Sequence, residues 1–197
     1  MMKELRTAIR AIIVFTIMLG LIYPLAVTVF AQIFFKSQAN GSLIVNQDGK
    51  IAGSVLIGQS FSSPEYFHPR SSFAGTGYDA IQSSGSCLGP TNKKLVEAVA
   101  ENLSKVLKEN PGVKAKDVPV DAVTASASGL DPHISPEYAE LQIPRVAKAR
   151  SMDVSEVRAL VDKYTDGRQI GFLGEPRVNV LLLNLELDRI KKVSNRR

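Results

Sequence analysis

The segment Ser84-Gly85-Ser86-Cys87-Leu88-Gly89-Pro90-Thr91-Asn92 carries the residue types that could bind a phosphate group. Glycines let a backbone approach an anion closely, and a helix that starts behind them presents free N–H groups. The segment lacks the Gly-Lys-Ser/Thr ending of a P-loop, however, and Pro90 removes one N–H donor. It is therefore either a phosphate cradle, through Ser84, Gly85, Ser86 and Gly89, or a tight structural turn.

Other catalytic and metal-binding patterns are missing from the sequence. The chain has two histidines, His68 and His133, and one cysteine, Cys87, so these residues alone cannot build a His/Cys metal cluster or an intrachain disulfide. His133 follows Asp131 closely and fits either an acid–base group or a hydrogen-bonded structural residue. Neither a Gly-x-Ser-x-Gly nor a His-Glu-x-x-His motif occurs. We therefore predict no catalytic residue and no metal site.

A long apolar stretch lies near the N-terminus. Residues Ala11 to Phe35 (AIIVFTIMLGLIYPLAVTVFAQIFF) include no charged side chain. A helix of this length rises about 1.5 Å per residue and covers about 37 Å, more than the ~30 Å hydrocarbon core of a bilayer. A core helix is rarely apolar on every side over such a length. The stretch predicts a transmembrane helix over 11–35, in which Pro24 either kinks the helix or marks a packing site.

Basic residues flank this stretch unequally. Those before it are Lys3, Arg6 and Arg10. After it, Lys36 is the only basic residue before Lys50. Because basic residues favour the cytoplasmic side, the pattern predicts a cytoplasmic N-terminus (1–10) and an extracytoplasmic domain (36–197).

A cleaved signal peptide is the alternative interpretation of the same stretch. Val29-Phe30-Ala31 has the small-residue spacing that a signal peptidase accepts, and cleavage there would release an independent exported protein, such as an enzyme. The apolar run continues beyond Ala31, however, and is longer than the core of a signal peptide. These two properties favour an uncleaved anchor that crosses the membrane once.

Composition narrows the class of the remaining domain. The formal net charge of the chain is +5 at pH 7, and part of it comes from the N-terminal cluster and a basic C-terminal tail. This charge is too small to indicate nucleic-acid binding. The domain is long enough to bury a core, and without a disulfide it must be stabilised by packing or by a partner.

Residue periodicity predicts an α+β fold for this domain. We expect a β-hairpin over Gly41–Phe61 with its turn at Asp48-Gly49, an irregular functional loop over Ser62–Asn92, an extended segment over Val118–Thr124, and helices over Lys93–Lys108, Pro136–Arg150 and Asp153–Tyr164. Thr91 or Asn92 can cap the first helix, and Ser135 the second, which Pro144 should bend. Val178–Asp188 fits a helix or a strand almost equally, and we favour a helix.

Seven blocks of residues resemble one family, the C subunits of potassium-transporting ATPases (KdpC). They are Gly53-Ser54-x-Leu56-Ile57-Gly58-Gln59-x-Phe61, Tyr66-Phe67-x-x-Arg70, Gly85-Ser86-x-Leu88-Gly89-Pro90-Thr91-Asn92, Pro119-Val120-Asp121-x-Val123-Thr124-Ala125-Ser126, Ser128 to Pro136, Arg145-Val146-Ala147, and Arg177-Val178-Asn179-Val180-Leu181-x-Leu183-Asn184. The blocks cover nearly the whole chain behind its single apolar stretch. Cys87 and Ser71-Ser72 depart from the pattern, which the family tends to fill with Asn and Pro-Ser.

The resemblance implies a supporting subunit of a bacterial ATP-driven potassium uptake complex in the inner (cytoplasmic) membrane. The implied partners are a potassium-translocating channel-like subunit, an ATP-hydrolysing P-type ATPase subunit and a small membrane subunit, with potassium as the transported ion. The chain lacks the Asp-Lys-Thr-Gly phosphorylation motif and a selectivity filter repeated over many spans. Both absences fit a non-catalytic role.

Two mechanisms remain open at this point. The family is described as a catalytic chaperone that raises the ATP affinity of the ATPase subunit, and the loops Ser83–Gly89 and Thr124–Gly129 would then be the candidate ATP contacts. The predicted topology opposes direct contact, because ATP is cytoplasmic and both loops lie outside. The alternative is an extracytoplasmic cap on the channel-like subunit that stabilises assembly and shapes potassium entry. Under this alternative, Asn92, Asp121 and Asp131 bond one another or partner backbone, and Arg70 is structural rather than ligand-binding.

Overall fold

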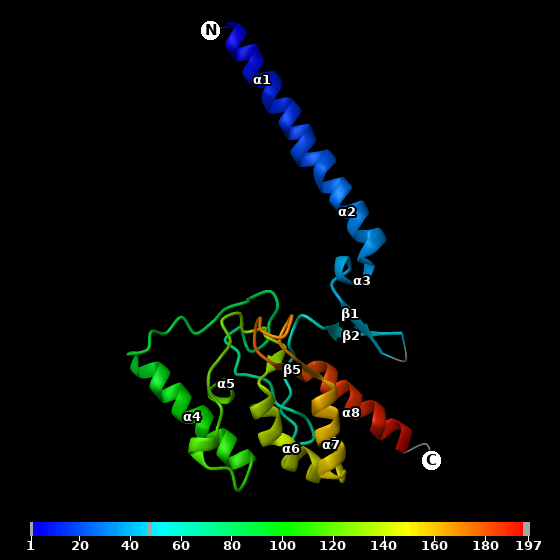
Figure 1. The fold of residues 1–197 in the computed structure, drawn as a ribbon. Helices are drawn as coiled ribbons and strands as arrows, with labels where there is room; N and C mark the ends of the chain where they lie inside the picture. Colours follow the sequence, from blue (N-terminus) through cyan, green and yellow to red (C-terminus); the bar gives the residue numbers. More distant parts are fainter. Residues whose placement is uncertain (1, 47–48, 195–197) are drawn as a thin grey trace. The chain divides into compact units, whose positions relative to one another are not determined.

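The apolar stretch is helical in the computed structural model of the protein. The structure describes residues 2–46 and 49–194. The helices that cover the stretch are α1 (Met2–Ile17), a π-helical turn η1 (Met18–Ile22) and α2 (Tyr23–Phe34), drawn in blue in Figure 1. Together they make an apolar helix over Met2–Phe34 that is long enough to cross a membrane. The stretch predicted as a single transmembrane helix is therefore helical, and the helix begins before Ala11.

The π-helical turn lies directly before Pro24. The Tyr23 N–H bonds to the Met18 carbonyl five residues back, which widens the helix by one residue at this point. Pro24 has no N–H to donate, and Thr28 Oγ1 donates to the Pro24 carbonyl at 2.8 Å. The expected disturbance at Pro24 is thus a local widening of the helix that starts before the proline.

A short helix and a hairpin complete the N-terminal unit, which ends at Ser54. The helix is α3 (Lys36–Ala39), and the hairpin pairs β1 (Leu43–Val45) with β2 (Ile51–Ser54) in antiparallel register. The predicted hairpin is confirmed, although its second strand stops well before Phe61. Of the predicted turn, Asp48 lies outside the described residues. The second compact unit begins at Val55, and the predicted 36–197 domain boundary stays a prediction.

Helices dominate this second unit. They are α4 (Lys93–Glu109), a 3₁₀ turn η2 (Ala115–Asp117), α5 (Val120–Val123), α6 (Pro136–Arg150), α7 (Val154–Lys163) and α8 (Val180–Ser194). A small antiparallel sheet has the order β3-β5-β4, from β3 (His133–Ile134), β5 (Arg177–Asn179) and β4 (Thr165–Asp166). The predicted α+β class is confirmed (Figure 1).

The three predicted helices begin where their capping residues place them. Asn92 Oδ1 accepts from the Lys94 N–H at 2.9 Å, Ser135 Oγ from the Tyr138 N–H at 3.0 Å, and Asp153 Oδ1 from the Ser155 N–H at 2.7 Å. Such bonds satisfy N–H groups that have no partner in the first helical turn. The predicted caps at Asn92 and Ser135 are therefore confirmed, and Asp153, the first residue of the third predicted helix, is the N-cap of α7.

Two sequence predictions need correction. The segment predicted as extended, Val118–Thr124, contains the one-turn helix α5, because Thr124 Oγ1 donates back to the Val120 carbonyl and Asn102 of α4 holds the Val123 carbonyl. The helix favoured over Val178–Asp188 is confirmed from Val180 onward as α8, but its first two residues belong to strand β5. Asn179 ends this strand and caps α8, since its Oδ1 accepts from the Leu182 N–H at 3.0 Å.

A segment of irregular backbone, residues 64–69, passes between α6 and α8 and buries Phe67 and His68 in the core. Phe67 of this core segment is fully buried, with Ile143 of α6 and Leu183 of α8 also fully buried in the same apolar cluster. Asn184 of α8 bonds both the N–H and the carbonyl of Phe67, each at 2.9 Å. Gln142 of α6 does the same for His68, at 2.7 and 3.2 Å. Two buried amide side chains thus replace the neighbouring strand that this backbone would otherwise need.

Candidate functional site

The two Ser/Gly-rich loops lie against each other in the folded domain. The Ser84 N–H donates to the Ser128 carbonyl at 3.0 Å, and Ser83 Oγ donates to the same carbonyl at 2.9 Å. Arg70 and Ser72 extend the contact, because Ser72 Oγ donates to the Gly129 carbonyl at 2.7 Å. The structure therefore brings the two predicted loops together, although they are far apart in the sequence.

Gly85 and Gly89 differ in what surrounds them. A Cβ atom at Gly85 would lie 2.7 Å from the Ala127 carbonyl oxygen, whereas nothing lies within 4 Å of one at Gly89. Ser86 Oγ closes a local turn by accepting from the Leu88 N–H at 3.4 Å. The Ser84 N–H is already bonded, so this geometry favours the turn interpretation of the loop. Nucleotide contact by Ser84, Gly85, Ser86 and Gly89 stays a prediction.

Substitution of the two glycines should separate their roles. Gly85→Ala is expected to lower the free energy of unfolding by about 1–3 kcal/mol, because the new methyl group must displace the Ala127 backbone. Gly89→Ala, the matched control, should change it by less than about 0.5 kcal/mol. Urea unfolding of the full chain in detergent measures both. Equal effects of the two substitutions would contradict the packing role of Gly85.

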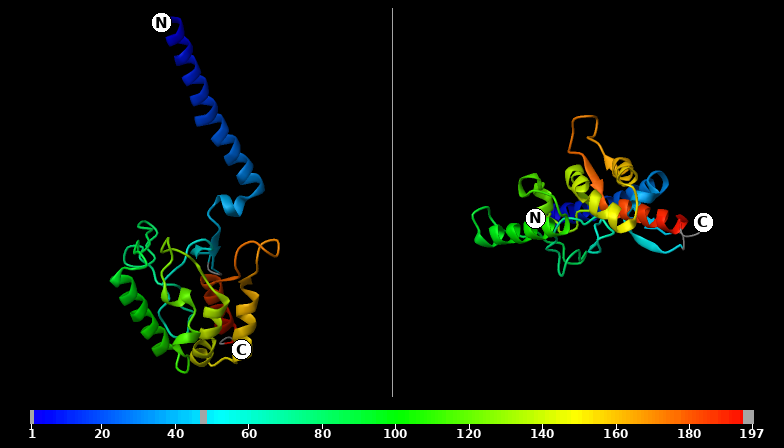
Figure 2. Two further views of the ribbon diagram at one scale, coloured as in Figure 1. Left: turned by 60° about the vertical axis from the view of Figure 1, so that its left-hand side comes forward. Right: turned by 90° about the horizontal axis from the view of Figure 1, so that it is seen from below.

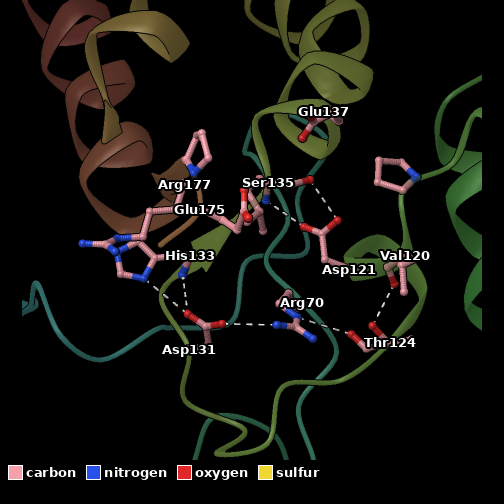
Figure 3. Close-up of a pocket in the computed structure, with 13 residues that line it drawn as sticks. Arg70, Val120, Asp121, Thr124, Asp131, His133, Ser135, Glu137, Glu175 and Arg177 are labelled. Carbon is pink, nitrogen blue, oxygen red and sulfur yellow. Dashed lines mark hydrogen bonds and ion pairs between the residues drawn. The ribbon is translucent and has the colours of Figure 1, made fainter. Parts of the chain in front are cut away.

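Arg70 joins the loop that carries it to the loop after α5 (Figure 3). Its Nη2 donates to the Ala125 carbonyl at 3.0 Å and its Nε to the Thr124 carbonyl at 3.5 Å, while Nη1 pairs with Asp131 Oδ2 at 3.3 Å. The Tyr78 hydroxyl in turn donates to the Arg70 carbonyl at 2.8 Å. Arg70 is therefore a structural cross-link between loops.

Asp131 is the acidic centre of this network. Its Oδ1 accepts from the His133 N–H at 3.0 Å and lies 3.3 Å from His133 Nδ1. Burial alone raises the pKa of Asp131, but the hydrogen bonds from His133 and the charge of Arg70 outweigh it, so the pKa lies below its ordinary value. His133 is accordingly a hydrogen-bonded partner of a carboxylate, as the structural interpretation of this histidine expected.

Acid should weaken the domain through Asp131. Its lowered pKa means that the carboxylate stabilises the fold above the ordinary value of 3.8 and loses that contribution as the pH falls through the folded-state pKa. We expect Asp131→Asn to cost about 1 kcal/mol at pH 7 and to cost less as the pH falls below about 4. Urea unfolding of both chains between pH 7 and pH 2.5 tests this, and a difference that grows in acid would contradict it.

These groups line a pocket of about 540 Å³. Its charged and polar lining residues are Arg70, Asp121, Thr124, Asp131, His133, Ser135, Glu137, Glu175 and Arg177 (Figure 3). Asp121 accepts from the N–H and Oγ of Ser135 at 2.7 and 2.9 Å, so each of its two carboxylate oxygens has a partner inside the chain. Among the described residues, no three His, Cys, Asp or Glu side chains are grouped to hold a metal ion. Within this pocket, hydrogen bonds and ion pairs of Arg70, Asp121 and Asp131 connect separate loops of the domain.

The second histidine, His68, belongs to the core. Its Nε2 lies 3.1 Å from the Ser63 carbonyl and its Nδ1 3.1 Å from Glu109 Oε2. Burial, helped by the charge of Arg145, lowers the pKa of His68, although Ser63 and Glu109 oppose the shift. Both ring nitrogens of His68 therefore lie within hydrogen-bond distance of oxygen atoms of the chain.

Four of the lining residues, Arg70, Asp121, Asp131 and His133, were recognisable in the sequence, but the lining between β4 and the start of β5 was not. Glu175 lies in this connection and Arg177 begins β5, and both reach the pocket only because β5 pairs with β3. The sequence holds no local signal for that pairing, because the strands are two and three residues long.

Comparison with known proteins identifies relatives over nearly the full chain. A family model described as "K+-transporting ATPase, c chain" matches residues 5–189. A protein of Koribacter versatilis named potassium-transporting ATPase KdpC subunit is 53% identical over 95% of both chains. A protein of Mycobacterium tuberculosis strain H37Rv with the same name is 54% identical over 96% of this chain and 100% of its own. A protein of Myxococcus xanthus, also with that name, is 53% identical over 96% of this chain and 89% of its own.

Proposed function

The chain belongs to the KdpC family of potassium-transporting ATPase subunits, and from this membership we propose that it is an accessory, non-catalytic subunit whose folded domain lies on the extracytoplasmic side of a bacterial inner membrane. Potassium is the ion that the complex transports. The proposed partners are the channel-like potassium-translocating subunit, the ATP-hydrolysing subunit and the small membrane subunit.

One observation carries the proposed topology. The only apolar helix long enough to cross a membrane in the described residues has Lys3, Arg6 and Arg10 in its first turns, and the compact unit from Val55 onward follows its other end. Basic residues favour the cytoplasmic side, and this bias supports a folded domain on the outer side. ATP is cytoplasmic, so the bilayer separates it from Ser84, Gly85, Ser86 and Gly89.

The domain then acts by docking rather than by chemistry. Its polar loops are cross-linked by Arg70 and packed at Gly85, which makes a rigid surface. We infer that this surface caps the channel-like subunit, stabilises the assembled complex and shapes the entry of potassium. A rise in the ATP affinity of the ATPase subunit, the catalytic chaperone effect, would reach that subunit through the membrane-spanning helix.

Photochemical crosslinking with azido-ATP tests the proposal. Sealed vesicles that expose the cytoplasmic face of the whole complex should show label on the ATP-hydrolysing subunit and none on this chain. Detergent-opened vesicles should give the same result, because the domain does not bind nucleotide directly. ATP-protected label on this chain would contradict the proposal and would restore the Ser84–Gly89 loop as a nucleotide contact.

A further inference from the structure

The connection between β4 and β5 ends in an exposed apolar tip. Ile170 is 82% exposed, Phe172 67% and Leu173 47%, and no charged residue lies from Gln169 to Gly174. In both views of Figure 2 this connection, drawn in orange, projects beyond the neighbouring helices of the domain. Three large apolar side chains on one projecting turn are unusual for a surface in contact with water only.

The tip is a built turn. The Gln169 N–H donates to the Leu173 carbonyl at 2.8 Å, and the Leu173 N–H donates to the Gln169 carbonyl at 2.9 Å. At its base, Arg168 pairs with Glu175. The three apolar side chains are therefore presented in a defined arrangement before any partner binds.

The backbone of the tip is strained at Ile170. This residue has a φ of +55°, in the left-handed region that β-branched side chains rarely adopt. Strain of this kind persists where the surroundings or a function require one backbone geometry. A fluid bilayer requires no particular geometry, whereas a shaped protein pocket does.

The size of the tip limits what can cover it. Two copies that met only through their tips would bury far less than the ~1,200 Å² of a stable interface, so a symmetric tip-to-tip dimer does not account for the tip. A few apolar and aromatic side chains can, however, anchor a larger interface with another protein. Membership of a transport complex provides such a partner.

We propose that Ile170, Phe172 and Leu173 insert into an apolar pocket on the extracytoplasmic surface of a membrane-embedded subunit of the same ATPase. This inference rests on the proposed function, because it places the domain on that side. The tip is the anchor of the interface. The bonds of Arg70 between loops stabilise the domain from which the tip projects.

Substitution at the tip should weaken assembly without unfolding the domain. With an affinity tag on the ATP-hydrolysing subunit, Phe172→Ser should reduce the amount of this chain retained after a detergent wash at least tenfold. Ile81→Ser is the matched control, since Ile81 is 93% exposed on another loop, and it should retain the wild-type amount. Both variants should keep the wild-type unfolding temperature. Wild-type retention of Phe172→Ser would overturn the proposal.

Photocrosslinking identifies the occupant directly. Benzoylphenylalanine in place of Phe172 should crosslink to a partner subunit in membranes that contain the whole complex, and in place of Ile81 it should not. Adducts with lipid alone, or none from position 172, would overturn the proposal. Membrane-impermeant labelling of Cys87 tests the topology separately, so a missing tip crosslink with Cys87 labelled from outside refutes the tip and leaves the proposed function standing.

Discussion

Replacing Asn184 by leucine is expected to lower the free energy of unfolding by about 2–5 kcal/mol, one of the two largest effects expected in this domain. Asn184 is 1% exposed, and its amide bonds the N–H and the carbonyl of Phe67, each at 2.9 Å. Leucine has a similar volume but leaves both backbone groups buried without a partner. Water bonds the N–H and the carbonyl of Phe67 in the unfolded chain, whereas neither group would have a partner in the folded variant. Better apolar packing by leucine cannot offset this cost.

Urea unfolding of the full chain in detergent, followed by its tyrosine signal, measures this loss. Asn102→Leu is a suitable comparison, because the half-buried Asn102 donates a single bond, to the Val123 carbonyl at 3.0 Å. That substitution should cost about 1 kcal/mol. If Asn184→Leu cost no more than Asn102→Leu, the core segment would not depend on side-chain amides for its hydrogen bonds.

Arg145→Lys should destabilise the domain by about 2–4 kcal/mol, although it keeps the positive charge. The guanidinium donates from Nη1 to the carbonyls of Pro64 and Tyr66, at 2.7 and 3.0 Å, and from Nη2 to Gln142 Oε1 at 2.7 Å. It therefore supports the same segment and also orients Gln142. A lysine ammonium cannot reach these separate acceptors with the fixed fork that arginine provides.

Lys148, an exposed residue one turn further along α6, supplies the control for this prediction. Lys148→Met should change the free energy of unfolding by less than about 0.5 kcal/mol. If Arg145→Lys were nearly as stable as the wild type, this position would require a positive charge and not the arrangement of donors that arginine provides.

Local signals in the sequence located the helices well. Asn92, Ser135 and Asp153 cap helices through bonds to N–H groups two or three residues ahead, and such bonds depend on short spacing alone. The apolar stretch is similarly local, and its helix follows directly. These elements could be predicted because their stabilising contacts lie within a few residues.

Elements that depend on distant contacts could not be predicted. The valines near Val120 favour a strand locally, yet α5 forms because Asn102 and Ser135, both outside the segment, bond its Val123 carbonyl and Asp121 side chain. Gln142 and Asn184 look like polar interruptions of apolar helix faces. Their role emerges only when residues 64–69 pass between α6 and α8.

The candidate site shows the same division. A structural role for Arg70 is predictable, whereas the sequence leaves open whether Asp131 bonds within the chain or to a partner, and the structure pairs it with Arg70 at 3.3 Å. The glycines of the Ser84–Gly89 loop look alike in the sequence, yet only Gly85 of the pair is packed against backbone, and this follows from a loop more than forty residues away. The exposed tip at Ile170 has no sequence signal, because exposure is a property of the fold.

The side of the membrane on which the domain lies is the central claim, and Cys87 can test it most directly. Cys87 is the chain's single cysteine, and it is exposed. In spheroplasts that contain the whole complex, a membrane-impermeant maleimide should label Cys87 before the membrane is opened. Met2→Cys in a Cys87→Ser background, at a position 72% exposed, should be labelled only afterwards. Labelling of Cys87 only after lysis, with Met2→Cys labelled in intact spheroplasts, would contradict the account.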